Sequence, residues 1–174
     1  TAVNVPFARG AAAISSDGTT LVGRTLGPPT PGAPIGFRPD RAYLWNGTPG
    51  DGPDLGSDGL ALLEMPSGVS TLASAQATAV SADGSTIVGT YVPDGNPRNT
   101  RPFLWTPDRG FQDLTVLLQT LGVPTTGWTL LEATDVSADG MTIIGTGQFR
   151  SELGRQFDGI WIAVIPEPST ALLL

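Results

Sequence analysis

The side chains of this chain that could do chemistry are carboxylates, hydroxyls and guanidinium groups. The 174 residues include no Cys, no His and no Lys, so all nine basic residues are Arg. The chain therefore has no Ser-His-Asp or Cys-His machinery, no ordinary zinc site, no Schiff-base lysine and no P-loop lysine. An enzyme built from the remaining types would be a glycosidase or a metal–carboxylate enzyme, and we predict neither a metal nor a cofactor.

Acidic residues are the candidates for such catalysis. Outside the repeated turns described below, these are Asp113, Glu132, Asp135 and Glu152. No pair of them has a recognisable motif, and Asp113 in FQDLTVLL has a counterpart at Asp54 in GPDLG, which indicates a structural role. Two carboxyl groups about 5–10 Å apart in one concave site would favour a glycosidase. The net charge of −7 argues against a nucleic-acid partner, because a phosphate backbone needs a basic surface.

One ten-residue pattern occurs three times, as ISSDGTTLVG at 14–23, VSADGSTIVG at 80–89 and VSADGMTIIG at 136–145. In each copy β-prone runs flank an Asp-Gly pair, which fits a tight hairpin turn. We interpret these pairs as turns rather than calcium ligands, because a calcium loop needs several oxygens within a dozen residues. The glycine that ends each copy marks a place where the second strand either bends or meets a neighbour closely. The turn residues are Asp17, Gly18, Asp83, Gly84, Asp139 and Gly140.

A third strand with a tryptophan follows each hairpin, in RAYLWNG, RPFLWTP and DGIWIAV. We expect Trp45, Trp105 and Trp161 at one equivalent core position rather than stacked on sugars. The Asp-Leu runs at Asp54 and Asp113 would add a short fourth strand. The period predicts an all-β, β-propeller-like fold with about three four-stranded antiparallel blades, a partial propeller. A β-sandwich built from the same hairpins is the alternative.

The predicted domain covers 1–165, with repeat units at about 10–74, 75–131 and 132–165. Between units, LTVLLQTLG has apolar residues at helical spacing and predicts one short helix near 114–121. We also expect Thr1–Phe7 to form a strand, either of a blade that lies upstream or of another unit. The final ALLL run is far too short for a complete membrane span.

The connections between second and third strands vary in length and sequence, as binding loops often do. They run over about 24–41, 91–101 and 147–156 and would open on the face opposite the Asp-Gly turns. Their seven arginines outnumber three acids (Asp40, Asp94 and Glu152), although the whole chain is acidic. This pattern indicates either solvated loop charges or a face that binds an acidic extracellular polysaccharide. The arginines are Arg24, Arg38, Arg41, Arg98, Arg101, Arg150 and Arg155.

The unit A-T-x-V-S-A-D-G-x-T-I-[VI]-G followed by [FY]-L-W resembles the bacterial extracellular repeats called the HAF family, over about 10–165. The tail VIPEPSTALLL is similar to a PEP-CTERM sorting signal, with its triplet at Pro166, Glu167 and Pro168. The segment 166–174 lacks the full hydrophobic helix and terminal basic residues of that signal. The resemblance implies export to the surface or exterior of a Gram-negative bacterium and, for the parent protein, an exosortase-type partner. It brings no enzymatic activity or catalytic residues.

Three functions are compatible with these features. The first is a non-catalytic, secreted or cell-surface module that binds or structures the envelope or its polysaccharide matrix. The second is a carboxylate-dependent, carbohydrate-active enzyme on a propeller. The third is a fragment without autonomous function, because three blades are fewer than the usual four to eight.

Overall fold

The computed structural model describes residues 8–29, 37–46 and 59–165, which form three antiparallel sheets and one short helix. The first sheet contains β1 (Ala8–Ile14), β2 (Thr20–Leu26), β3 (Asp40–Asn46) and β4 (Leu60–Leu62). The second contains β5 (Ser74–Val80), β6 (Ile87–Val92), β7 (Arg101–Thr106) and β8 (Gly110–Asp113). The third contains β9 (Trp128–Val136), β10 (Thr142–Arg150) and β11 (Gln156–Val164), and the helix is α1 (Leu114–Thr120).

The predictions of three antiparallel units and one short helix near 114–121 are confirmed. None of the sheets closes on itself. Within the described ranges the third sheet has three strands rather than the four expected. The fourth strand of the first unit is Leu60–Leu62, not the run at Asp54, which lies outside the described residues.

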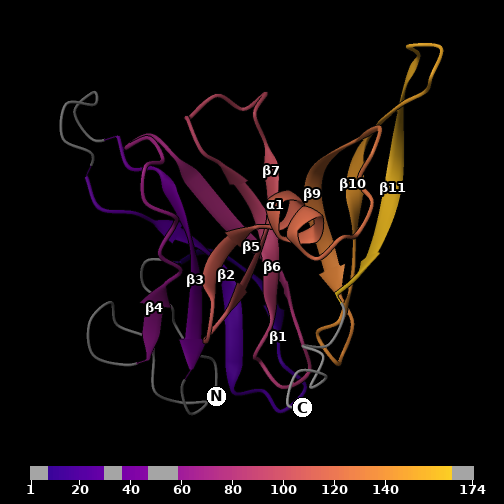
Figure 1. The fold of residues 1–174 in the computed structure, drawn as a ribbon. Coiled ribbons are helices and arrows are strands. Elements are labelled where there is room, and N and C mark those ends of the chain that lie inside the picture. Colours follow the sequence, from indigo (N-terminus) through magenta and orange to yellow (C-terminus); the bar gives the residue numbers. More distant parts are fainter. Residues whose placement is uncertain (1–7, 30–36, 47–58, 166–174) are drawn as a thin grey trace, which may run out of the picture.

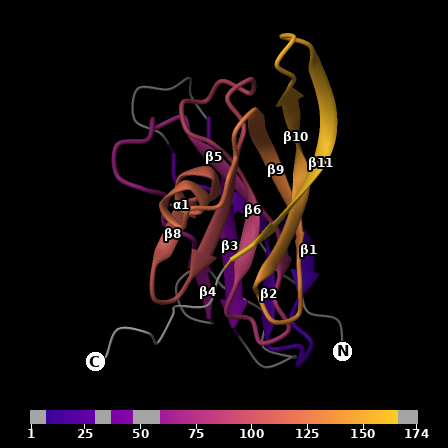
Figure 2. The same ribbon diagram turned by 45° about the vertical axis from the view of Figure 1, so that its right-hand side comes forward.

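The three sheets pack in series, and each packs on the next in the same way (Figures 1 and 2). Strand β5, the first of the second sheet, lies across β1, β2 and β3, and β9 lies in the same manner across β5, β6 and β7. One apolar core lies between the first and second sheets, and another lies between the second and third. Helix α1 adds Leu114, Leu117 and Leu118 to the second core, so its apolar face is buried between sheets.

A bulge in the first strand of each unit explains the repeated glycine. The registers shift between Ala11 and Ala13 in β1, between Ala77 and Ala79 in β5, and between Ala133 and Asp135 in β9. The carbonyl group just before each bulge is thereby pressed against the second strand. A Cβ on the facing glycine would lie only about 2 Å from that oxygen, so no larger residue fits. Of the two alternatives, a bend or a close approach, the close approach is the one found at these glycines. The glycine–carbonyl pairs are Gly23 with Gly10, Gly89 with Gln76 and Gly145 with Glu132.

The prediction that the three tryptophans are equivalent is wrong. The repeat glycine pairs with Tyr43 in the first unit, with Phe103 in the second and with Trp161 in the third. Trp161 therefore occupies the position of Tyr43 and Phe103, opposite the glycine. Trp45 and Trp105 lie two residues further along their strands. Trp45 and Trp161 are nonetheless buried, and Trp105 is half-buried, which agrees with a core role.

Each Asp-Gly pair lies in a hairpin turn, as predicted, and the loop of this turn has four residues. In the second turn the Ser81 N–H donates to the Thr86 carbonyl, and four residues lie between Ser81 and Thr86. Only the glycine has a positive φ, +75° at Gly84, and Asp83 keeps a negative one. The other two turns repeat these hydrogen bonds, so the motif is a four-residue loop with a left-handed glycine.

The aspartate of each turn accepts hydrogen bonds from the residues around it. Asp83 Oδ1 accepts from the Ser81 hydroxyl at 2.6 Å and from the Ser85 N–H at 3.0 Å. The Ser81 oxygen in turn accepts from the Thr86 N–H at 2.9 Å. These bonds, the Ser81 hydroxyl first, hold the pKa of Asp83 at about 2. The pKa values of Asp17 and Asp139 are lowered in the same way, so the role of these aspartates is to stabilise the turn.

The three turns also bond to one another. The Ser16 N–H donates to the Ala82 carbonyl, and the Ala82 N–H donates to the Ala138 carbonyl, both at 3.0 Å. The turn glycine of the second unit and that of the third each lie against the threonine that ends the turn of the preceding unit. A Cβ on Gly84 would lie 2.3 Å from Thr20 Oγ1, and one on Gly140 would lie 2.5 Å from Thr86 Oγ1. The repeated motif therefore fixes how one sheet stacks on the next as well as each hairpin.

Two further predictions fall on residues outside the described ranges, namely the strand at Thr1–Phe7 and the tail with Pro166, Glu167 and Pro168. Among the described residues no helix is long and apolar enough to cross a membrane.

We predict that Gly89→Ala destabilises the fold, because the new methyl group would collide with the Gln76 carbonyl and the Phe103 ring. Overpacking of this kind costs about 1–3 kcal/mol, which would lower the melting temperature by several degrees in thermal unfolding. Gly10→Ala is the matched control, since a Cβ at Gly10 meets nothing within 4 Å. Equal melting temperatures for the two variants would contradict this account of the repeat glycine.

We predict that stability falls as the pH is lowered from about 4 toward 2. The folded-state pKa of Asp83 lies below the ordinary value of 3.8, so the unfolded chain takes up protons first and acid favours unfolding. Asp83→Asn should show a smaller change in melting temperature over this interval than the wild type. Asp108→Asn, an exposed acid at the same end of the sheets, serves as the control. If all three proteins respond identically, the turn aspartate does not carry the effect.

Candidate functional site

The connections between second and third strands lie at one end of the molecule, opposite the Asp-Gly turns (Figures 1 and 2). These are the β2–β3, β6–β7 and β10–β11 connections, and we refer to their end as the loop end. The β10–β11 hairpin projects beyond the β6–β7 connection (Figure 1). The described parts of the β2–β3 and β6–β7 connections lie side by side, because Arg38 and Pro97 line the same cavity.

Three of the seven candidate arginines are engaged within the fold. Arg24 lies 3.6 Å from Asp40. Arg41 is half-buried, donates to the Ala73 carbonyl between the first and second units, and has a pKa lowered by burial. Arg101 pairs with Asp113 at 3.3 Å. These guanidinium groups hold the loop end together, which makes them poor candidates for direct ligand binding.

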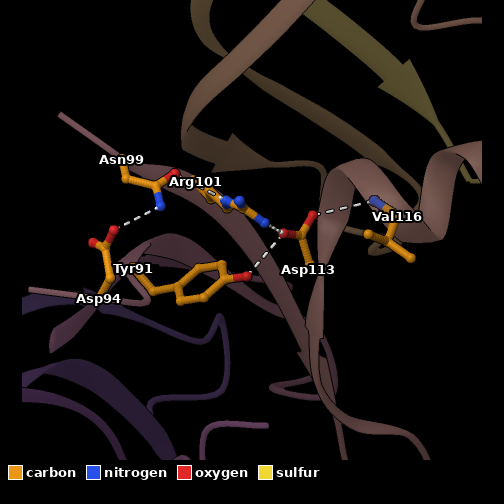
Figure 3. A network of polar contacts seen from close by, with 6 residues as sticks. All are labelled: Tyr91, Asp94, Asn99, Arg101, Asp113 and Val116. Carbon is orange, nitrogen blue, oxygen red and sulfur yellow. Dashed lines mark hydrogen bonds and ion pairs between the residues drawn. The ribbon is translucent and has the colours of Figure 1, made fainter. Parts of the chain in front are cut away.

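Arg101 belongs to a polar network on the second sheet (Figure 3). One oxygen of Asp113 accepts from the Tyr91 hydroxyl at 2.8 Å and pairs with Arg101. The other oxygen accepts from the Val116 N–H at 3.1 Å, so that Asp113 caps α1. Burial, together with hydrogen bonding to Asp113, raises the pKa of Tyr91, which stays protonated as a donor.

The same network reaches the β6–β7 connection. Arg101 Nε donates to the Asn99 side chain, and the Asn99 amide donates to Asp94 at 3.1 Å (Figure 3). Asp94 also accepts from the Asn96 N–H, which shapes the turn beside Arg98. The described part of the first unit has no equivalent network, because the strand pairing places Leu62 of β4 where β8 has Asp113. The predicted correspondence of Asp113 with Asp54 is therefore wrong.

The other four candidate arginines are exposed, and their guanidinium groups have no ion-pair partner within the described ranges. Arg38 and Arg98 belong to the neighbouring β2–β3 and β6–β7 connections. Arg150 and Arg155 lie on the projecting β10–β11 hairpin, with Glu152 between them in the sequence. Two of these arginines thus belong to neighbouring connections, and the other two lie on the projecting hairpin.

A cleft runs along the loop end between the first and second sheets. One part, of about 250 Å³, is lined by the β2–β3 connection, the start of β5 and the β6–β7 connection. A neighbouring part of about 230 Å³ shares Asp40, Ser74 and Val92 with it and extends to Glu132. We call both parts together the loop-end cleft. Its lining includes Arg9, Phe37, Arg38, Asp40, Leu72, Gln76, Tyr91, Pro97, Thr100 and Glu132.

The chemistry of the cleft suits a polar ligand that has an apolar side. Phe37 and Leu72 are partly exposed and offer apolar contacts. Arg38 offers a positively charged guanidinium group with several N–H donors, and Gln76 and Thr100 offer neutral hydrogen-bonding groups. Asp40 lies between Arg9 and Arg24, each 3.6 Å away, so its charge is already balanced by protein groups. The cleft can therefore bind a ligand through Arg38 without strong repulsion from Asp40.

The four acids considered from the sequence lie in different places. Only Glu132 lines the cleft, where it shares the smaller part with Asp40. Asp113 belongs to the network, Asp135 is exposed on β9, and Glu152 lies near the tip of the β10–β11 hairpin. Arg9, Phe37 and Leu72 were missed as site residues, because nothing in their local sequence indicates that β1, the β2–β3 connection and the β4–β5 connection meet.

The fold defines the class of this protein as a β-sheet repeat protein, with antiparallel units stacked in series. No protein-family model, no curated protein and no solved structure matches the chain.

We predict that Asp113→Ala destabilises the protein by about 2–4 kcal/mol, because it leaves the buried Tyr91 hydroxyl without an acceptor and removes the cap of α1. Chemical denaturation measures this loss. Asp108→Ala, an exposed acid in the β7–β8 turn, should change stability by less than about 0.5 kcal/mol. In the Asp113→Ala background, a further Tyr91→Phe change should cost little. Full additivity of the two losses would show that Tyr91 and Asp113 are not coupled.

Proposed function

We propose that this chain is a non-catalytic, exported repeat protein with a partial β-propeller fold, and that it binds an acidic extracellular polysaccharide at the loop-end cleft. The propeller is supported by the serial packing, in which the first strand of each new sheet covers the preceding sheet. A sandwich would instead place two sheets face to face around one core, whereas here two separate cores lie between three sheets.

The observation that carries the ligand proposal is the pair of exposed, unpaired arginines beside the cleft. Arg38 lines the cleft, and Arg98 follows Pro97, which also lines it. A guanidinium group binds a carboxylate or sulfate group through two parallel hydrogen bonds, so two of them suit a polymer with repeated acidic groups. Phe37 supplies a flat apolar surface that can pack against a sugar ring.

The location of the protein rests on the sequence alone. The HAF-like repeats and the PEP-CTERM-like triplet at Pro166, Glu167 and Pro168 support export and display on, or release from, a Gram-negative cell. An exosortase-type enzyme would be the partner of the parent protein during sorting. An acidic polysaccharide is a ligand that a protein in this location would meet.

A second candidate function is hydrolysis of a glycan, because Asp40 and Glu132 line one part of the same cleft. Two carboxylates in one concave site are the minimal machinery of a glycosidase. Asp40 lies 3.6 Å from Arg9 and from Arg24, and Glu132 would be the second carboxylate of the pair.

The binding proposal predicts that Arg38→Ala combined with Arg98→Ala weakens binding to acidic glycans on an array, and that added salt weakens binding of the wild type in the same direction. Loss of two charge-assisted contacts should lower affinity about tenfold or more. Arg109→Ala is the matched control, because Arg109 is an exposed arginine of the β7–β8 turn at the opposite end.

Unchanged binding by the double variant, or an equal loss in Arg109→Ala, would contradict a site at the loop-end cleft. Release of reducing ends from any glycan would instead favour the second candidate function, provided that Glu132→Gln abolishes the release.

A further inference from the structure

The outer face of the third sheet is apolar, and no described element covers it. On this face Ile144 of β10 is 40% exposed, and Ile160 and Ile162 of β11 are 78% and 69% exposed. Val164 of β11 is also exposed. Contiguous exposed apolar side chains of this kind mark a surface that contacts another protein, a membrane or a ligand. We call this surface, formed by Ile144, Ile160, Ile162 and Val164, the open face.

The strand registers identify what covers the corresponding surface inside the chain. Ile144 pairs with Ile162 as Val88 pairs with Leu104 in the second sheet and as Val22 pairs with Leu44 in the first. Val88 and Leu104 are 0% and 4% exposed, because β9 of the following unit lies across them. Val22 and Leu44 are buried in the same way by the unit that begins with β5. The open face therefore has the layout of a surface covered by the first strand of a unit.

The chain also contains a first strand that covers no sheet. Strand β1 is equivalent to β5 and β9, but no described sheet precedes it. Ala11 and Ile14 of β1 are exposed, whereas the equivalent Ala133 and Val136 of β9 are buried against the second sheet. The strand that would fit the open face is thus present at the other end of the same array.

The turns at the two ends are complementary as well. The Ala138 N–H has no acceptor among the described residues, although the equivalent N–H groups of Ser16 and Ala82 each bond to the next turn. At the other end, a Cβ on Gly18 would meet nothing within 4 Å, whereas Gly84 and Gly140 each sit against a threonine. Thr142 of the third unit is the threonine that has no such glycine beside it.

Charge agrees with this pairing. Exposed acids on the strands of the third sheet are Glu132, Asp135 and Asp158, and β1 contributes Arg9, which lies 3.6 Å from Asp40 but is still more than half exposed. A contact between these strands therefore joins opposite charges around an apolar centre.

We propose that β1 of a second copy of this chain docks on the open face and repeats the packing found twice within the chain. The contact is head-to-tail, so each copy contributes its open face to one neighbour and its β1 to another. Such contacts make a closed ring or a longer chain of copies, and two copies of three sheets each fall within the four to eight blades of known propellers.

Light scattering after size exclusion tests this proposal with two one-sided variants. Ile160→Glu with Ile162→Glu damages only the open face, and Ala11→Glu with Ile14→Glu damages only β1. The wild type should have at least twice the monomer mass, and each variant alone should be monomeric. A mixture of the two variants should form a one-to-one complex, because each keeps the side that the other lacks.

Val116→Glu, which places a charge on the exposed side of α1 away from both surfaces, should associate as the wild type does. Circular dichroism and thermal unfolding establish that each variant is folded, and for a variant that is not folded the single changes Ile160→Glu and Ile14→Glu take its place. A monomeric wild type would overturn the proposal. Association of the β1 variant by itself would also overturn it, because it would mean that two open faces pack on each other.

Discussion

The contact on which the rest of the structure depends is the one between the bulged first strand and the glycine of the second. At each bulge a carbonyl oxygen is pressed so close to the neighbouring strand that a Cβ would lie about 2 Å away. A bulge bends a strand and increases its twist, so the first strand can turn across the preceding sheet. The bulge also directs Thr78 Oγ1 to the Ala133 carbonyl of the next unit, at 2.7 Å. One backbone irregularity therefore serves both the hairpin and the contact between sheets.

The Asp-Gly turn adds a second constraint that acts at the same end. Its aspartate and serine accept hydrogen bonds from backbone N–H groups of the loop. The N–H group of the residue after the serine, Ser16 or Ala82, donates to a carbonyl group of the next turn. Because these groups are polar and directional, they fix the offset between sheets more strictly than apolar packing alone would. This explains why the aspartate is repeated although it has no part in the loop-end cleft. Its chemistry is used to stabilise the array.

The opposite end is free of these constraints, and there the units differ. Only the second unit has the network of Tyr91, Arg101 and Asp113, which links the β6–β7 connection to the start of α1. The third has a long hairpin that projects beyond the sheets (Figure 1). A constant end that holds the sheets and a variable end that presents side chains is the division expected of a binding scaffold. The loop-end cleft lies where two variable connections meet.

The sequence by itself determined the hairpins, the three units and the short helix. These depend on turn chemistry, on β-prone runs and on apolar spacing, which act between residues close in the chain. The tertiary structure decided which residues are equivalent across strands. Trp161 takes the position of Phe103 because a third strand is aligned by its pairing with the glycine-bearing strand, not by its distance from the turn.

The tertiary structure also decided which arginines are free. From the sequence all seven loop arginines are alike, yet Arg41 is half-buried against the Ala73 carbonyl and Arg101 is paired with Asp113, while Arg38 faces a cleft. The partner of a long charged side chain depends on which segments the packing brings together. The close approach of β1, the β2–β3 connection and the β4–β5 connection joins residues far apart in the chain, and no local pattern specifies it.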